Sequence, residues 1–242
     1  MRIKRVSVFT IKNNLEGKVW NPKIRWLVKY SVLVEIETEN GLKGLGECWC
    51  FDSQPDALIT FFRTEVISKF EGALTQERDA ICRDLLDSTT LSARHGIMYS
   101  VVSGIDIALW DIEAQSKDLP LYQLLGGTTG EVNLYASGGL YGENKSTDDL
   151  TTELSGYVKA GFECVKMKVG GMEIKEDTKR VRSVRDALGP DIGIILDGVY
   201  SYTTEDAVRM FDSVRDVEIL AFQSPITLSE GEKMVNLINE HN

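Results

Sequence analysis

From residue 132 onward, the sequence alternates between short apolar runs and amphipathic helical patterns. The apolar runs are residues 132–137, 162–169, 192–197 and 219–223, and each is followed by a segment with apolar residues at helical spacing. Strands that alternate with helices pair in parallel, because each helix returns the chain to the same end of the sheet. The alternation therefore predicts an α/β domain with a parallel sheet of about four β/α units.

The first half of the chain has a different pattern. Up to about residue 50, apolar and polar residues alternate as in an antiparallel β meander, with a tight turn at Asn40-Gly41. Residues 55–125 then have apolar residues at helical spacing, and we expect the lone His95 in this region to be structural. These patterns predict an α+β domain over residues 1–128, followed by the β/α domain over residues 129–242.

Residues 162–169, which read F-E-C-V-K-M-K-V, form the most informative strand. Side chains alternate along a strand, so the apolar residues share one face, and Lys166 and Lys168 share the other. The helical patterns on both sides indicate that the apolar face packs under helices, which leaves the lysines adjacent on the inner face. Mutual repulsion and lost hydration both lower the pKa of a lysine toward that of a base. The alternative is a solvated edge strand with two surface lysines.

Polar residues also end the next two strands. Asp197 ends the apolar run after the lysine strand, and Gln223 ends the run after that. Functional groups of such sheets lie at the carboxyl ends of the strands. The two lysines, Asp197 and Gln223 could form a simple ion-pair cluster. Their position at the ends of consecutive strands favours a functional site instead. In such a site Asp197 binds a divalent cation, and a lysine removes a proton next to a carboxylate held on that cation.

Three of these features together carry a family resemblance. The helix with S-G-I-D-I-A-L-W-D at residues 103–111, the K-x-K strand and the acid that ends the next strand resemble the mandelate racemase and muconate lactonizing enzyme branch of the enolase superfamily. The resemblance covers nearly the whole chain. It implies an enolase-like capping domain over residues 1–128 and part of a TIM-type (β/α) barrel over residues 129–242. It also implies Mg²⁺ and removal of the proton next to a carboxylate, as in a sugar-acid dehydratase or a 2-hydroxy-acid racemase.

The resemblance also implies roles for single residues. Lys168 matches the base, and Lys166 matches the neighbour that lowers the pKa of the base and contacts the carboxylate. Asp197 matches the first metal ligand, and Gln223 stands where a second ligand is expected.

The polar loop over residues 13–25 matches the specificity loop of the family. Trp20, Lys23 and Arg25 are therefore candidate substrate-binding residues. The alternative is that the tryptophans at positions 20 and 26 anchor the loop to its own domain.

The sequence also departs from the family pattern. Gln223 replaces the usual Glu, so the site loses one negative charge for Mg²⁺, and Val199 stands where the family often has Asn. The sequence ends at Asn242, after about four of eight β/α units, so we expect the third metal ligand and an opposing acid or base to lie beyond it. The alternative function is therefore that of a truncated, catalytically inactive relative or a half-barrel interaction module.

Composition narrows the choice of partners. The net charge of −10 disfavours nucleic acid, and no apolar run is long enough to cross a membrane. The N-terminus lacks the pattern of a signal peptide, and the four cysteines have no zinc spacing, so we expect reduced thiols in a cytoplasmic protein. The expected partners are a small-molecule carboxylate or sugar acid and, through open sheet edges, further copies of the chain in a homo-oligomer.

Overall fold

The computed structural model describes residues 1–50, 55–88 and 96–241. These residues form two compact units, of which the first contains Met1–Leu15 and Leu27–Glu131 and the second contains Glu16–Trp26 and Val132–Asn242. His95 lies outside the described residues. None of the described helices is both long and apolar enough to cross a bilayer.

The first unit contains the expected antiparallel meander. Its strands are β1 (Ile3–Asn14), β3 (Val28–Thr38) and β4 (Lys43–Cys48), in the order β1-β3-β4. Its helical elements are α1 (Pro55–Phe61), the π-helix η1 (Phe62–Val66), α2 (Ile67–Phe70), the 3-10 helix η2 (Thr75–Glu77), α3 (Arg78–Ser88), α4 (Ile97–Ser116) and α5 (Leu121–Leu124).

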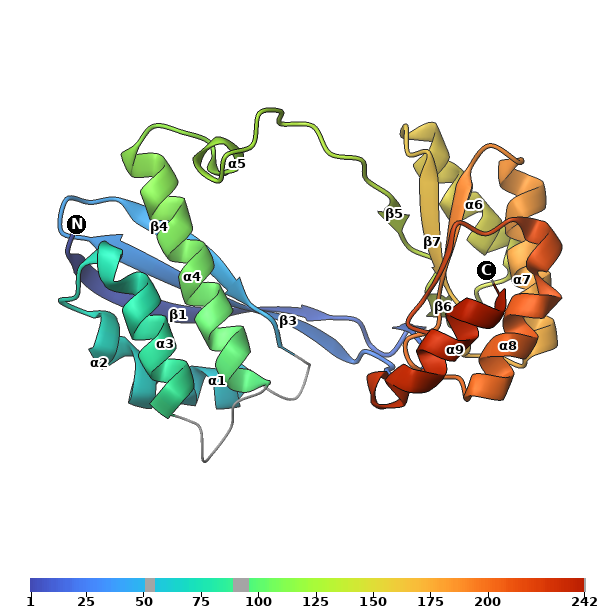
Figure 1. Ribbon diagram of the computed structural model, residues 1–242, viewed down its shortest axis with the longest axis horizontal. Helices are drawn as coiled ribbons and strands as arrows, with labels where there is room; N and C mark the ends of the chain where they lie inside the picture. The colour runs from blue at the N-terminus through green and yellow to red at the C-terminus, as the bar shows by residue number, and fades with distance from the viewer. Residues whose placement is uncertain (51–54, 89–95, 242) are drawn as a thin grey trace. The chain divides into compact units, whose positions relative to one another are not determined.

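Helix α4 lies directly against β4, as Figure 1 shows. The contact depends on small residues, since a Cβ atom on Gly46 would lie 1.9 Å from the carbonyl oxygen of Gly104. A Cβ atom on Gly44 would likewise lie 2.0 Å from the carbonyl oxygen of Ala108. The G-L-G spacing therefore fits a strand whose inward face touches a helix backbone.

The second unit is a parallel α/β sheet, as the sequence predicted. Strands β5 (Ala136–Ser137), β7 (Cys164–Lys168), β8 (Gly193–Asp197) and β9 (Ala221–Gln223) are neighbours in that order. The helices are α6 (Thr147–Lys159), α7 (Ile174–Leu188), α8 (Thr204–Ser213) and α9 (Gly231–His241), with 3-10 turns η3 (Arg215–Val217) and η4 (Leu228–Glu230).

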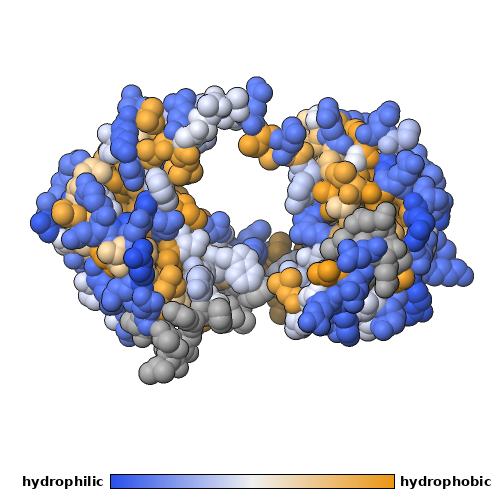
Figure 2. All heavy atoms as spheres, viewed as in Figure 1, coloured by the Kyte–Doolittle hydropathy of each residue, from blue (hydrophilic) through white to orange (hydrophobic). Residues whose placement is uncertain are grey.

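Helices α6, α7 and α8 cover one side of this sheet (Figure 1). Val165, Met167 and Val169 point into that core and are fully buried. The side chains of Ser146 and Thr203 cap the first turns of α6 and α8 by accepting backbone hydrogen bonds. Hydrophilic side chains cover the outer side of α7 and α8 in Figure 2, as expected for amphipathic helices.

Two strands are shorter than the sequence indicated. The first was expected over residues 132–137, but only Ala136 and Ser137 pair, with Val165 and Lys166 of β7. The preceding apolar residues have no strand neighbour, and Val132 is 77% exposed. The last strand likewise starts at Ala221, two residues later than expected. Residues 132–135 have no strand pairing, whereas next to β9 the Leu220 amide still donates to the Ile194 carbonyl oxygen at 2.8 Å although the regular strand begins one residue later.

A short antiparallel strand pair connects the loop Glu16–Trp26 to the rest of the second unit. Strand β2 (Val19–Trp20) pairs with β6 (Tyr141–Gly142). The sequence pattern did not indicate this pairing, because its two halves lie far apart in the chain.

Candidate active site

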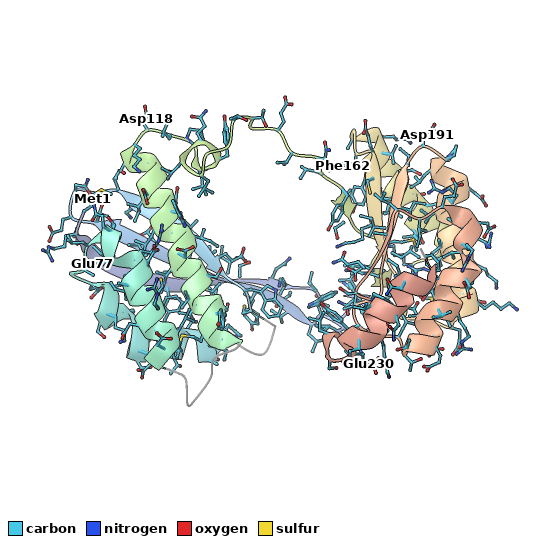
Figure 3. All side chains as sticks on the ribbon, viewed as in Figure 1. Met1, Glu77, Asp118, Phe162, Asp191 and Glu230 are labelled. Atoms are coloured by element: carbon cyan, nitrogen blue, oxygen red, sulfur yellow. The ribbon has the colours of Figure 1, made fainter. Side chains whose placement is uncertain are left out.

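Lys166, Lys168, Asp197 and Gln223 converge at the carboxyl ends of three adjacent strands. Lys168 is the register partner of Asp197, and Asp197 is the register partner of Gln223. Figure 3 shows the direction of the strands, since Phe162 and Asp191, which precede β7 and β8, lie at one end of the unit and Glu230, which follows β9, lies at the other.

The side chain of Asp197 is shared between the two lysines. Its Oδ2 lies 2.5 Å from Lys168 Nζ and 3.6 Å from Lys166 Nζ. The three side chains are largely buried, with 8%, 15% and 9% of Asp197, Lys168 and Lys166 exposed. Two ammonium groups and one carboxylate leave a net positive charge, which attracts an anion in a partly desolvated place.

Lys166 has two further polar partners. Its Nζ donates hydrogen bonds to Gln223 Oε1 at 3.0 Å and to the Tyr135 hydroxyl at 3.3 Å. Tyr135 was missed by the sequence analysis, although it precedes Ser137, the register partner of Lys166, by two residues. The available signal was side-chain alternation, because residues two apart in an extended segment, such as Tyr135 and Ser137, share a face.

The turn after β8 holds the carboxylate from its other side. The Val199 amide donates to Asp197 Oδ1 at 3.1 Å. Val199 and Tyr200 adopt φ angles of 49° and 56°, a left-handed region that β-branched and bulky residues rarely occupy. Strained backbone of this kind concentrates at functional sites, so the turn supports the choice of Asp197 as a site residue.

The residues present do not fit Mg²⁺ by themselves. Asp197 and Gln223 offer oxygen atoms of the kind that Mg²⁺ binds, but the ion takes about six ligands. Both residues already accept hydrogen bonds from lysine ammonium groups. Within the described ranges, no group of three or more His, Cys, Asp or Glu side chains is placed to hold a metal ion.

The candidate substrate-binding residues lie in the loop Glu16–Trp26. The ring of Trp20 stacks on the ring of Tyr141, with centroids 6.3 Å apart and planes inclined by 15°. The guanidinium of Arg25 lies 4.0 Å from the centre of the Trp20 ring. Lys23 is exposed, and its backbone amide donates to Asn21 Oδ1 at 2.8 Å. Trp20 and Arg25 thus form a stack on Tyr141, while the lysines, Asp197 and Gln223 form a separate cluster.

Helix α7 contributes two buried charged residues that the sequence analysis did not single out. Asp177 is fully buried and Arg180 is 8% exposed. Burial raises the pKa of the adjacent Tyr141 hydroxyl, and the Asp177 carboxylate raises it further, so Tyr141 stays neutral. The available signal was helical spacing, because Asp177 and Arg180 are in phase with the buried Val181 and Val184.

Two protein-family models match the chain. Residues 28–126 match the N-terminal domain of mandelate racemase / muconate lactonizing enzyme. Residues 149–239 match the enolase C-terminal domain-like family.

Curated relatives include sugar-acid enzymes. The chain is 35% identical over 199 residues to an arabinonate dehydratase of Saccharolobus solfataricus, a match that covers 81% of this chain and 52% of that protein. It is 29% identical over 232 residues to a D-galactarolactone cycloisomerase of Agrobacterium fabrum, which covers 93% of this chain and 59% of that protein. The chain therefore spans between 52% and 59% of the length of these relatives.

Solved structures share the fold. A racemase from Streptomyces coelicolor, solved with bound magnesium, superposes with a TM-score of 0.92 over 99% of this chain and 67% of that chain. The two sequences are 24% identical, so the likeness supports the architecture alone.

Proposed function

We propose an enzymatic activity for this chain. The chain belongs to the mandelate racemase and muconate lactonizing enzyme branch of the enolase superfamily. The proposed activity is removal of the proton next to the carboxylate of a small sugar acid. The names of the relatives, a dehydratase of arabinonate and a cycloisomerase of galactarolactone, support this substrate class.

The observation that carries the proposal is the ion pair between Lys168 and Asp197 beside Lys166. The net positive charge of this group attracts the substrate carboxylate, and Lys166 with the Tyr135 hydroxyl offers it two hydrogen-bond donors. Lys168 then acts as the base. Its contact with Asp197 has to open first, because the Lys168 amine accepts a proton only in its neutral form.

The proposed step moves one proton and leaves one electron pair behind. The proton next to the carboxylate passes to Lys168 Nζ, and the electron pair moves into the carboxylate to form an enediolate. In a sugar-acid dehydratase, the β-hydroxyl then leaves as water with a proton from a second acid. In a 2-hydroxy-acid racemase, a proton returns on the opposite face. Both reactions begin with removal of the proton next to the carboxylate by Lys168. This first step is the one that the residues of this chain support.

The proposal also assigns roles to the loop Glu16–Trp26 and to a metal ion. Trp20, Lys23 and Arg25 remain the candidates for substrate contact, with the exposed Lys23 ammonium best suited to bind a second anionic or hydroxyl group. Mg²⁺ is the ion that the family resemblance implies, and in this chain it would need ligands beyond Asp197 and Gln223. The proposed location is the cytoplasm, in keeping with cysteines that form no disulfide in the part of the chain that the structure describes.

The test is deuterium incorporation next to the carboxylate of sugar acids in D₂O, followed by NMR with and without added Mg²⁺. A panel of pentonates, hexonates and hexarates covers the proposed class. We expect at least one acid to exchange faster with the chain than in buffer. Exchange at the buffer rate for every acid would contradict the proposal and favour a catalytically inactive relative.

A second candidate function is assembly with further copies of the chain through the sheet edges. Strands β5 and β9 lie at the two ends of the strand order. Beside them, Leu134 and Leu220 are 67% and 66% exposed. Unpaired edges flanked by apolar side chains are templates for strand pairing, and a parallel β5–β9 pairing between copies satisfies both edges. Sedimentation velocity tests this candidate, since a monomer at every concentration would contradict it.

A further inference from the structure

Four side chains of the second unit form a continuous stack that starts in the loop Glu16–Trp26. The guanidinium of Arg25 lies over the Trp20 ring, and Trp20 stacks on Tyr141. The guanidinium of Arg180 lies 4.2 Å from the centre of the Tyr141 ring. Cation–π and ring-stacking contacts alternate along the series, and both kinds are attractive. The stack therefore links the loop to helix α7.

Arg180 continues the connection to the strand that carries the proposed base. Its Nη1 donates to the carbonyl oxygen of Lys168 at 3.0 Å and to Asp177 Oδ1 at 2.6 Å. Its Nη2 points to the carbonyl oxygen of Gly139, 3.5 Å away. One planar guanidinium thus fixes the backbone at Lys168 and stacks on Tyr141, a combination that a lysine cannot provide.

Asp177 and Tyr141 hold the residues that follow Lys168. Asp177 Oδ2 accepts a hydrogen bond from the Gly170 amide at 2.7 Å. The Tyr141 hydroxyl donates to Asp177 Oδ1 at 2.8 Å and accepts from the Gly171 amide at 2.9 Å. The glycine at 171 is needed there, since a Cβ atom would lie 2.5 Å from the Tyr141 ring.

Burial makes this arrangement sensitive to the loss of any member. Asp177 and Arg180 form an ion pair whose side chains are 0% and 10% exposed. A buried pair is tolerated when its remaining hydrogen-bonding groups are satisfied, and removal of one partner leaves an uncompensated charge. A change in the Asp177–Arg180 ion pair, in the Tyr141 ring or in the amides of residues 170 and 171 therefore affects the other two.

We propose that Tyr141, Asp177 and Arg180 are positioning residues that couple docking of the loop Glu16–Trp26 to the backbone geometry at Lys168. Movement of Trp20 frees the Tyr141 ring, and a displaced ring weakens the hydrogen bonds at residues 168–171. The consequence for catalysis rests on the proposed function. The coupling itself is a property of the folded chain and is measured without any substrate.

The test is amide hydrogen exchange by NMR in variants at each end of the network. Trp20→Ala removes no hydrogen-bond acceptor of Gly170 or Gly171, because these amides donate to Asp177 and Tyr141. We expect exchange of these two amides to become faster by roughly fivefold or more, the lower end of typical coupling between sites. Coupling is reciprocal, so Asp177→Asn should accelerate the loop amides of Gly17 and Asn21, which donate to Trp26 and Ile24.

Matched controls separate coupling from general loosening. Lys23→Ala changes an exposed side chain of the same loop and should leave Gly170 and Gly171 unaffected. The Gly193 amide, which donates to Glu163 at the opposite end of the sheet, is the reference for global unfolding. Trp20→Phe keeps a stacking ring and should restore most of the protection.

Two results would overturn the proposal. The first is faster exchange of loop amides in Trp20→Ala with unchanged exchange at Gly170 and Gly171. The second is equal acceleration of Gly193, which would mean plain destabilisation. If Asp177→Asn does not fold, Tyr141→Phe takes its place and is read at the loop amides of Gly17 and Asn21. This variant removes only the hydroxyl that donates to Asp177 and accepts from the Gly171 amide. Because none of these readouts needs turnover, the coupling can fail or hold independently of the proposed activity.

Discussion

Lys168 and Asp197 are register partners on adjacent parallel strands, and their side chains meet at 2.5 Å at the carboxyl ends of those strands. The same carboxylate oxygen lies 3.6 Å from Lys166. One carboxylate thus allows two like-charged side chains to lie next to each other with little exposure. Loss of this carboxylate leaves both ammonium groups without their nearest countercharge.

Asp197→Asn should therefore destabilise the second unit. We expect the free energy of unfolding to fall by about 2–3 kcal/mol, somewhat below the cost of breaking a fully buried pair, because the lysines keep some contact with water. Urea unfolding followed by circular dichroism measures the change. Asp191→Asn is the matched control, since it removes an exposed carboxylate just before the same strand. Equal stability of Asp197→Asn and the wild-type chain would contradict the role given to this carboxylate.

Mg²⁺ should bind weakly or not at all to the chain. Asp197 and Gln223 supply one negative charge and two ligand residues, and both are engaged by lysines. Calorimetric titration should show no saturable heat at millimolar Mg²⁺. A micromolar dissociation constant that disappears in Asp197→Ala would show that the site is complete without further ligands.

Gly46→Ala should destabilise the first unit. The added methyl group would lie 1.9 Å from the Gly104 carbonyl oxygen, which is a backbone atom of α4 and not the end of a flexible side chain. Overpacking of this kind costs about 1–3 kcal/mol, and contact with backbone places this site at the upper end. Thermal unfolding tests the expectation against Gly156→Ala, where an added Cβ atom meets nothing within 4 Å. A melting temperature for Gly46→Ala that equals that of Gly156→Ala would mean that α4 and β4 are not in close contact.

Glu153 should contribute to acid sensitivity. Burial raises the pKa of this carboxyl, but hydrogen bonds from Lys145 and the Gly139 amide outweigh burial and hold the pKa below its usual 4.5. The folded chain therefore binds fewer protons at this group than the unfolded chain does. The resulting stability is complete above the unfolded pKa and is lost as the pH falls through the lower folded pKa.

Glu153→Gln should accordingly flatten the dependence of unfolding free energy on pH below about 4.5. Urea unfolding between about pH 3 and pH 6 measures this slope. Glu205→Gln, which removes an exposed carboxylate on α8, is the control. A slope for Glu153→Gln as steep as that of the wild-type chain would show that its contacts with Lys145 and Gly139 do not hold the pKa down.

Local patterns were enough to predict the elements that carry the lysine cluster. Alternation along residues 162–169 placed the lysines on one face, and the acid after residues 192–196 followed from the run of apolar residues that it ends. Both are short-range signals, because side-chain direction in a strand depends on position alone. The meander of the first unit was predictable for the same reason.

The rest depended on contacts between distant segments. Trp20 meets Tyr141 across more than a hundred residues, and no periodicity in either segment indicates that they pair. Residues 132–135 show the opposite case, in which an apolar run has the composition of a strand but lacks a neighbour to pair with. Strand formation requires a partner, and the local sequence does not contain that information.

The most direct measurement of the central claim is deuterium incorporation next to the carboxylate of the best exchanging sugar acid, compared among Lys168 variants. Lys168→Ala removes the amine, and Lys168→Arg keeps the positive charge but stays protonated. Both should lose about 10²–10⁴-fold in exchange rate, the usual cost of a lost general base. Lys159→Ala, which changes an exposed lysine on α6, should retain the wild-type rate. Wild-type exchange in either Lys168 variant would contradict the assignment of Lys168 as the base.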